Sequence, residues 1–588
     1  MSDADADLIP SGSVDRRQLA RLLRYVRPYR GLLAVSTGLL VVQAGLTVVG
    51  PLLTQAALDR AIPAGDADLL LRYAALYVAA LLGSFVAEYV DTLVTTRIGQ
   101  AVMSDIRNAV FAHLQRLSIP FFDRNPVGRL MTRVTADVET LNELFSSGVV
   151  AVFGDLFTLL AIAGVMIWTD WQLALVSFLA MPLLWLVVTA FRRAVREAFR
   201  EIRLRVARMN AYLQEQLAGM RVIHLFNREA ASAAGFERVN RAHLDAHLRS
   251  INLYAIFFPA VELVTAIATA LILFEGGRRI TDLTLSVGVL AAFIQLVRRF
   301  FRPLQDLSEK FNLFQGAVAS GERVFRLLDT PVTVVEPAAP TRLPQPVRGE
   351  VEFDRVWFRY ADDGPWALQD VSFRVAAGDT VALVGHTGAG KTTVVNLLLR
   401  FHDPTRGRIT LDGIDLRELD LDELRSQYGY VQQDLFLFTG DLMRNLALDP
   451  TTSEAEVRRA AERVGVADFV ESLPGGYGHV LTERGRNVSV GERQLLSFAR
   501  ALARDPAILL LDEATSSVDS ATEVVIQNGI AELMAGRTAI VVAHRLSTIQ
   551  TADEILVMHR GRIAERGTHR ALLARDGVYR RLSAVGLG

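Results

Sequence analysis

The chain has 588 residues, 51% of them hydrophobic, and its formal net charge at pH 7 is −1. This length exceeds one ordinary domain, and the positive mean hydropathy argues against a wholly soluble protein. The near-zero charge argues against nucleic acid as a partner, and the absence of cysteine excludes disulfides and thiolate chemistry.

The N-terminal segment, residues 1–16, contains Asp3, Asp5 and Asp7 and no apolar run. Such a segment cannot be a secretory signal, and we expect it to be disordered. Targeting must therefore depend on internal apolar spans.

A predicted membrane domain occupies residues 17–330. Most of its apolar stretches approach the roughly twenty residues that a bilayer-spanning helix requires. We predict six transmembrane helices, of which the last is the shortest: 32–49, 69–94, 149–169, 171–190, 252–274 and 285–297.

Arginine distribution predicts the orientation of these spans. The segments 97–133 and 192–249 are long and rich in arginine, whereas the connections at 59–68, 169–171 and 275–284 are short. By the positive-inside rule, both termini lie in the cytoplasm, and we expect a multi-pass protein of the bacterial inner membrane. The helical periodicity of 183–218 predicts long cytoplasmic extensions, whose arginines we interpret as solvated helix surface.

After a proline-rich linker at 331–348, the pattern changes to short strands alternating with helices. Residues 349–588 are therefore predicted to form an α/β P-loop nucleotide-binding domain that follows the helical membrane domain.

A complete G-x-x-x-x-G-K-[ST] sequence lies at 385–392 in this domain, between a short apolar strand and a helix. Backbone N–H groups at such a turn face an anion, and the alternative is a chance glycine-rich turn. Lysine occurs only at Lys310 and Lys391 in this arginine-rich chain, so a compact ammonium was kept where phosphates bind. The predicted ATP-binding residues are Gly385, His386, Thr387, Gly388, Ala389, Gly390, Lys391, Thr392 and Thr393, with the Thr392 hydroxyl on Mg²⁺.

An apolar run at 507–511 ends in two carboxylates, Asp512 and Glu513. At the end of a buried strand beside a phosphate loop, the first is suited to hold Mg²⁺ and the second to polarise the attacking water. The alternative is a core strand with a capping aspartate.

The segment 488–494, Val-Ser-Val-Gly-Glu-Arg-Gln, resembles the LSGGQ signature of ATP-binding cassette (ABC) proteins. The resemblance implies that Tyr360 stacks on adenine and that Gln433 senses Mg²⁺ and water. It also implies that Asp519 crosses to the partner and that His544 contacts the γ-phosphate.

The membrane half is similar to the exporter branch of that family, in which six helices precede the cassette. Residues 118–128 and 219–228 resemble its two cytoplasmic connections, and 483–485 resembles the loop that touches them. The resemblance implies that two chains enclose two ATP molecules and switch the helices between inward-facing and outward-facing states.

The signature keeps Ser489 and Gly491 but has Val490 and Glu492 where the family has glycine and glutamine. A carboxylate beside a polyanion weakens the contact with ATP held by the partner cassette, unless a nearby arginine offsets it. The chain thus resembles one half of a heterodimeric exporter, which we favour over a homodimer with a tolerated variant.

Two acidic residues lie near the centres of predicted spans, Asp155 and Glu262. Such groups are often functional, and they would suit a cationic amphipathic substrate. The alternatives are structural hydrogen bonding between helices and exposure to a water-filled cleft. We predict an ATP-driven exporter of hydrophobic or amphipathic compounds such as drugs, peptides or lipids. The alternatives are a lipid or lipid-conjugate flippase and an ATP-gated membrane regulator that does not transport.

Overall fold

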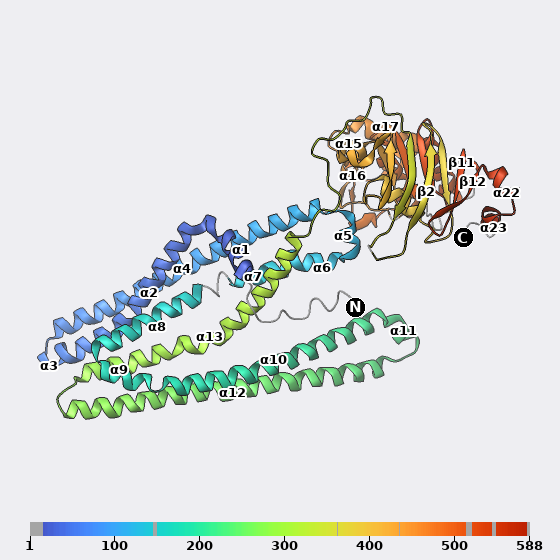
Figure 1. The fold of residues 1–588 in the computed structure, drawn as a ribbon. Coiled ribbons are helices and arrows are strands. Elements are labelled where there is room, and N and C mark those ends of the chain that lie inside the picture. Colours follow the sequence, from blue (N-terminus) through green and yellow to red (C-terminus); the bar gives the residue numbers. More distant parts are fainter. Residues whose placement is uncertain are drawn as a thin grey trace. The chain divides into compact units, whose positions relative to one another are not determined.

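The computed structural model describes residues 16–144, 150–361, 363–433, 435–512, 520–543 and 549–584. The chain divides into two compact units, each described by itself (Figure 1). The first unit extends to Gln115 and continues at Val127–Thr330, and the second comprises Arg116–Pro126 and the chain from Pro331 onward.

All regular secondary structure among the described residues of the first unit is helical. Its helices are α1 (Arg16–Val26), α2 (Arg30–Ala56), α3 (Ile62–Ala64), α4 (Ala67–Arg116), α6 (Val127–Thr132), α7 (Val138–Glu143), α8 (Val150–Thr169), α9 (Trp171–Phe178), α10 (Met181–Ala218), α11 (Met220–Leu225), α12 (Glu229–Thr281) and α13 (Val287–Leu328). Helices α10 and α12 lie side by side and are joined through α11 (Figure 1). Their rings stack, with the centroids of Phe191 and Phe257 3.9 Å apart.

Five helical stretches among the described residues are long and apolar enough to cross a membrane: Ala20–Ala64, Ala67–Arg116, Val150–Thr169, Trp171–Ala218 and Glu229–Thr281. They coincide with the first five predicted spans. The sixth predicted span, 285–297, overlaps the start of α13, which is 42 residues long but does not belong to these five. At 1.5 Å per residue, the 53-residue α12 is about 80 Å long against a hydrocarbon core of about 30 Å. The long helices therefore extend well beyond a bilayer.

Polar contacts connect the ends of these helices to other segments of the unit. The Asp59 carboxylate accepts hydrogen bonds from the Ser286 hydroxyl at 2.6 Å and the Gly288 N–H at 2.8 Å, and so caps α13. Arg279 pairs with Asp170 at 2.8 Å, and both side chains are largely buried. These contacts join segments that are far apart in the sequence.

The second unit contains two main sheets. The antiparallel sheet has the order β2-β1-β4-β5, and the six-stranded sheet has the order β12-β11-β3-β10-β9-β6 and is parallel except for β12. A two-stranded sheet pairs β7 with β8. The strands are β1 (Val351–Phe358), β2 (Leu368–Val375), β3 (Thr380–Val384), β4 (Arg406–Leu411), β5 (Ile414–Asp415), β6 (Tyr428–Val431), β7 (Gly440–Asp441), β8 (Val480–Leu481), β9 (Ile508–Asp512), β10 (Thr538–Val542), β11 (Glu554–His559) and β12 (Arg562–Gly567).

The helices of this unit are α5 (Ile119–Arg124), α14 (Lys391–Leu398), α15 (Leu421–Ser426), α16 (Leu442–Leu446), α17 (Glu454–Val464), α18 (Ala467–Ser472), α19 (Val490–Leu502), α20 (Ser520–Met534), α22 (His569–Leu573) and α23 (Val578–Ala584). The central strands are buried on both faces. In β9, Leu509 and Leu511 belong to one apolar cluster, whereas Ile508 and Leu510 belong to the other. This explains the continuous apolar run of the sequence, because alternate side chains of a strand enter opposite cores. The predicted fold class, a helical membrane region followed by an α/β nucleotide-binding domain, is confirmed.

Candidate functional site

The phosphate loop joins the end of β3 to the start of α14, as the sequence predicts. Gly388 and Gly390 adopt left-handed conformations, with φ of 78° and 105°. A Cβ at Gly390 would lie 2.8 Å from a methyl of Leu368 and 2.9 Å from the carbonyl oxygen of Ala367. Glycine is therefore required at position 390 both for its conformation and for space.

Lys391 is the first residue of α14, and only 6% of it is exposed. Its ammonium donates hydrogen bonds to the backbone carbonyls of Gly385, at 2.5 Å, and His386, at 3.3 Å. Burial lowers the pKa of Lys391, and attraction to Asp512 partly opposes this shift. The loop thus encloses a cation near an acidic strand end.

Sheet topology brings Asp512 and Gln433 to the same edge of the sheet as the phosphate loop. Strands β3, β9 and β6 run parallel, so the phosphate loop, Asp512 and Gln433 all lie at carboxyl ends of strands. Asp512 is buried, whereas Thr392 and Gln433 are exposed. Burial, with a contribution from the Asp512 charge, raises the pKa of Tyr430 to about 12.

These residues fit a nucleotide-bound Mg²⁺, because that ion takes one or two carboxylates and completes its shell with phosphates and water. In the described part of the chain, no group of three or more histidine or acidic residues could hold a metal ion by itself. A divalent ion here would be held by Asp512 and Thr392 together with the nucleotide.

Tyr360 lies two residues beyond the end of β1 and is 43% exposed. Its hydroxyl is 3.0 Å from the Thr393 hydroxyl in the first turn of α14. Its ring packs edge-on against Phe358 and His402, with centroid distances of 4.9 and 5.2 Å. Burial lowers the pKa of His402. An aromatic surface therefore lies beside the phosphate loop.

Three further predicted residues lie outside the described residues: Glu513, His544 and Asp519. Asp512, which precedes Glu513, is the last residue of β9. Ala543, which precedes His544, directly follows the adjacent strand β10.

The variant signature forms the first turn of α19, with Ser489 as its N-cap. The Glu492 carboxylate accepts the backbone N–H of Ser489 at 2.7 Å, and the Ser489 hydroxyl accepts the N–H of Glu492 at 3.3 Å. This is a capping box, which engages two N–H groups at the helix start. Val490 is exposed and Gly491 is buried.

The nearby arginine does not pair with Glu492. The guanidinium of Arg493 donates to the carbonyls of Gly485, at 3.1 Å, and Val488, at 3.0 Å. It therefore fixes the loop that precedes α19.

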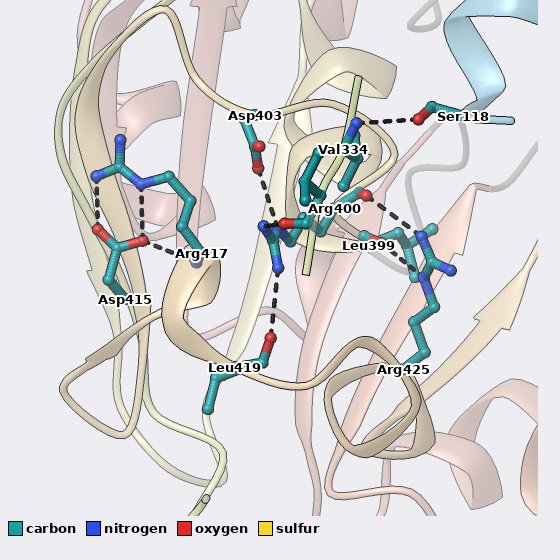
Figure 2. A network of polar contacts seen from close by, with 10 residues as sticks. Ser118, Val334, Leu399, Arg400, Asp403, Asp415, Arg417, Leu419 and Arg425 are labelled. Carbon is teal, nitrogen blue, oxygen red and sulfur yellow. Dashed lines mark hydrogen bonds and ion pairs between the residues drawn. The ribbon is translucent and has the colours of Figure 1, made fainter. Parts of the chain in front are cut away.

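A buried arginine, Arg400, and a half-buried one, Arg425, which sequence reasoning missed, hold the loops around the site. Arg400, which follows α14 and is 2% exposed, donates to Val335 O, to Leu419 O and to Asp403 (Figure 2). Arg425 donates to the carbonyls of Leu399 and Arg400 at 3.3 Å, and burial lowers its pKa. In a chain with so many arginines, no local signal separates these from solvated ones.

Arg500 of α19 is half-buried, and this burial lowers its pKa to about 10. It donates to the carbonyls of Asn445, at 2.9 Å, and Phe436, at 2.8 Å. The signature helix is thus tied to the segment that follows Gln433.

The predicted substrate-pathway residues lie on two helices of the first unit. Asp155 on α8 is half-buried, and Glu262 on α12 is exposed. The predicted pathway contains only acidic residues, but basic residues also lie on a helix of this unit. On α13, Arg298 and Arg302 are exposed, and Arg299 donates a hydrogen bond to the carbonyl of Thr47 on α2. Acidic side chains therefore do not by themselves determine the charge of a substrate.

Comparison with known proteins identifies the family. The family description "ABC transporter transmembrane region" matches residues 33–304, and "ABC transporter" matches residues 368–516. The chain is 38% identical to an uncharacterised ABC transporter ATP-binding protein of Bacillus subtilis, over 96% of this chain and 93% of that protein. This chain belongs to the ABC transporter family. It is also 35% identical to an ATP-dependent lipid A-core flippase of Syntrophus aciditrophicus, over 96% of this chain and 93% of that protein.

A further relative is a multidrug efflux ATP-binding/permease protein of Mycobacterium bovis, which is 36% identical over 96% of this chain and 47% of its own length. A transmembrane region followed by an ATP-binding domain on one chain is the arrangement of an ABC half-transporter. The chain is an integral membrane protein and a transport ATPase. Its family membership confirms the ATP-driven export predicted from its sequence.

The glycines of the phosphate loop give a direct test of its geometry. Gly390→Ala should destabilise the second unit by about 1–3 kcal/mol, because it combines a left-handed φ with a steric clash. Gly388→Ala is the matched control, since its Cβ would meet no atom within 4 Å and only the conformational penalty of roughly 1 kcal/mol remains. Denaturant unfolding followed by tryptophan fluorescence measures both, and equal losses would contradict the geometry.

Proposed function

We propose that the chain is one subunit of an ATP-driven exporter of hydrophobic or amphipathic compounds, and that the loop at 385–393 binds the phosphates of ATP. The observation that carries this proposal is the buried Lys391 ammonium at the start of α14, beside the Asp512 carboxylate. A buried cation in the first turn of a helix is suited to a polyanion, because the N–H groups at a helix start also favour negative charge.

Each residue around the loop has a proposed role. Lys391 moves from the loop carbonyls to the outer phosphates, Thr392 and Asp512 hold Mg²⁺, and Tyr360 supports the adenine. Gln433 and Glu513 orient the attacking water, and His544 contacts the γ-phosphate. When bound, Mg²⁺ would neutralise charge that develops on the phosphates.

Closure requires a second cassette, because the start of α19 faces the nucleotide of a partner in this family. We propose that Ser489, Val490, Gly491 and Glu492 cover the partner's ATP and that Asp519 lies at the same interface. ATP binding then biases a two-state rearrangement of the long helices, and hydrolysis resets it. Both termini and the cassette are assigned to the cytoplasmic side of a bacterial inner membrane.

The signature supports a heterodimer. The Glu492 carboxylate occupies the N–H of Ser489, so a negative charge lies where a partner's γ-phosphate would approach. We propose that a partner with a standard signature completes the site at Lys391, while the site covered by Glu492 hydrolyses weakly.

The substrate class is amphipathic. The efflux and flippase relatives support this proposal, as do the charged residues of both signs on the helices of the first unit. Lipid or lipid-conjugate translocation is the second candidate, because the flippase relative aligns over 93% of its own length.

Replacement of Lys391 tests the nucleotide site. Lys391→Ala should weaken ATP binding by at least about tenfold, because a charge-assisted contact is lost. Lys391→Arg should also fail to restore transport, since the planar guanidinium does not replace a compact ammonium. Equilibrium ATP binding and ATP-dependent uptake into vesicles measure both, and undiminished uptake by Lys391→Ala would refute the proposal.

Glu513→Gln should bind ATP like the unchanged chain and hydrolyse it negligibly, because the amide cannot polarise the attacking water. Single-turnover hydrolysis in the purified assembly measures this effect. Rapid turnover by this variant would refute the role of Glu513.

Two matched helix caps separate signature function from helix stability. Ser489→Ala and Ser453→Ala each break a capping box, so each should lower stability by about 1 kcal/mol. Only Ser489→Ala should also lower ATPase activity, because α17 lies outside the proposed ATP interface. Equal ATPase losses in both variants would assign Ser489 to stability alone.

The heterodimer is tested by purifying this chain alone and together with candidate half-transporter partners. We expect weak ATPase activity alone and a rise of at least about tenfold with the right partner, since a catalytic constellation is completed only then. Full transport by this chain alone would establish a homodimer.

A further inference from the structure

Tyr360 is held in place from several segments of the second unit. The ring is flanked by Phe358, at the end of β1, and by His402, in the loop after α14. The hydroxyl contacts Thr393, in the first turn of α14. Side-chain contacts therefore fix the ring relative to the phosphate loop.

The backbone of Tyr360 has a separate anchor. The guanidinium of Arg124 donates a hydrogen bond to the Tyr360 carbonyl oxygen. Arg124 is the last residue of α5, the short helix in the connection between α4 and α6. Among the described contacts to Tyr360, this one alone comes from a segment that joins two helices of the membrane half.

The other end of α5 is also tied to the second unit. The Ser118 hydroxyl, just before α5, accepts the N–H of Val334 at 3.0 Å, and the adjacent Val335 carbonyl accepts from Arg400 (Figure 2). Arg400 follows the end of α14, so the start of α5 is connected to the end of α14 through residues 334 and 335. Thr393 lies at the start of α14, so the end of α5 is connected to that start through Tyr360.

We propose that Arg124 is a positioning residue for the adenine site, which sets the position of Tyr360 according to the position of α5. The inference rests on the proposed function, in that Tyr360 must stack on the base of ATP. Movement of α5 shifts the Tyr360 backbone and changes the affinity for the base. By linkage, base binding biases the position of α5 by the same free energy.

A hydrogen bond to an exposed carbonyl predicts a modest effect on affinity. Arg124→Ala should raise the Kd for ATP about threefold to tenfold. It should leave the melting temperature unchanged, because its guanidinium lies at the surface. The same change should not alter the Kd for inorganic triphosphate, which lacks a base.

A double-mutant cycle distinguishes positioning from a general structural effect. Tyr360→Ala should weaken ATP binding, and Arg124→Ala should then add nothing further in the Tyr360→Ala background. Arg116→Ala is the matched control, because Arg116 ends α4, directly before the same connection, and its side chain makes no hydrogen bond or ion pair with any described residue. ATP binding to the full-length chain in lipid nanodiscs measures all four variants.

Additive losses from Arg124→Ala and Tyr360→Ala, or an equal loss from Arg116→Ala, would overturn the inference. An unchanged Kd in Arg124→Ala would do the same. Failure of the proposed function has a different signature, since Lys391→Ala would then bind ATP as tightly as the unchanged chain.

Discussion

The burial of one ammonium group is the constraint on which the rest of the site depends. Lys391 is the first residue of a helix whose start already carries positive partial charge, and among the described residues the loop carbonyls and the charge of Asp512 favour its protonated form. A buried cation is expensive unless it is compensated. The parallel sheet meets this requirement by placing an acidic strand end at the same edge, and we propose that the same arrangement binds phosphates and a divalent ion.

The signature carries the opposite charge at a similar structural position. At the start of α19, Glu492 caps its own helix, whereas at the start of α14 a lysine occupies the first turn. Both arrangements are locally stable, but only the second attracts an anion. In the proposed heterodimer, this difference between two helix starts would make the two ATP sites unequal, while the capping box keeps the cassette with the altered signature stable.

Periodicity and spacing were sufficient to predict the fold class, the first five spans and the strand–loop–helix at Lys391, because these depend on local pattern. The contacts of Arg124, Arg400 and Arg500 could not be predicted, since each joins segments distant in sequence and the chain offers dozens of similar arginines. The capping box was overlooked because Glu492 was considered only against the family signature. Position 492, three residues after Ser489, is a sequence signal that could have identified it.

We propose that the loop around Lys391 binds the triphosphate of ATP, which a second cassette then covers. The most direct test is an experimental structure of the assembled transporter carrying Glu513→Gln with ATP and Mg²⁺. The account predicts the γ-phosphate between the Lys391 ammonium and the partner's signature helix, with Lys391 no longer bound to the carbonyls of Gly385 and His386. A nucleotide bound elsewhere, with the lysine still on those carbonyls, would contradict it.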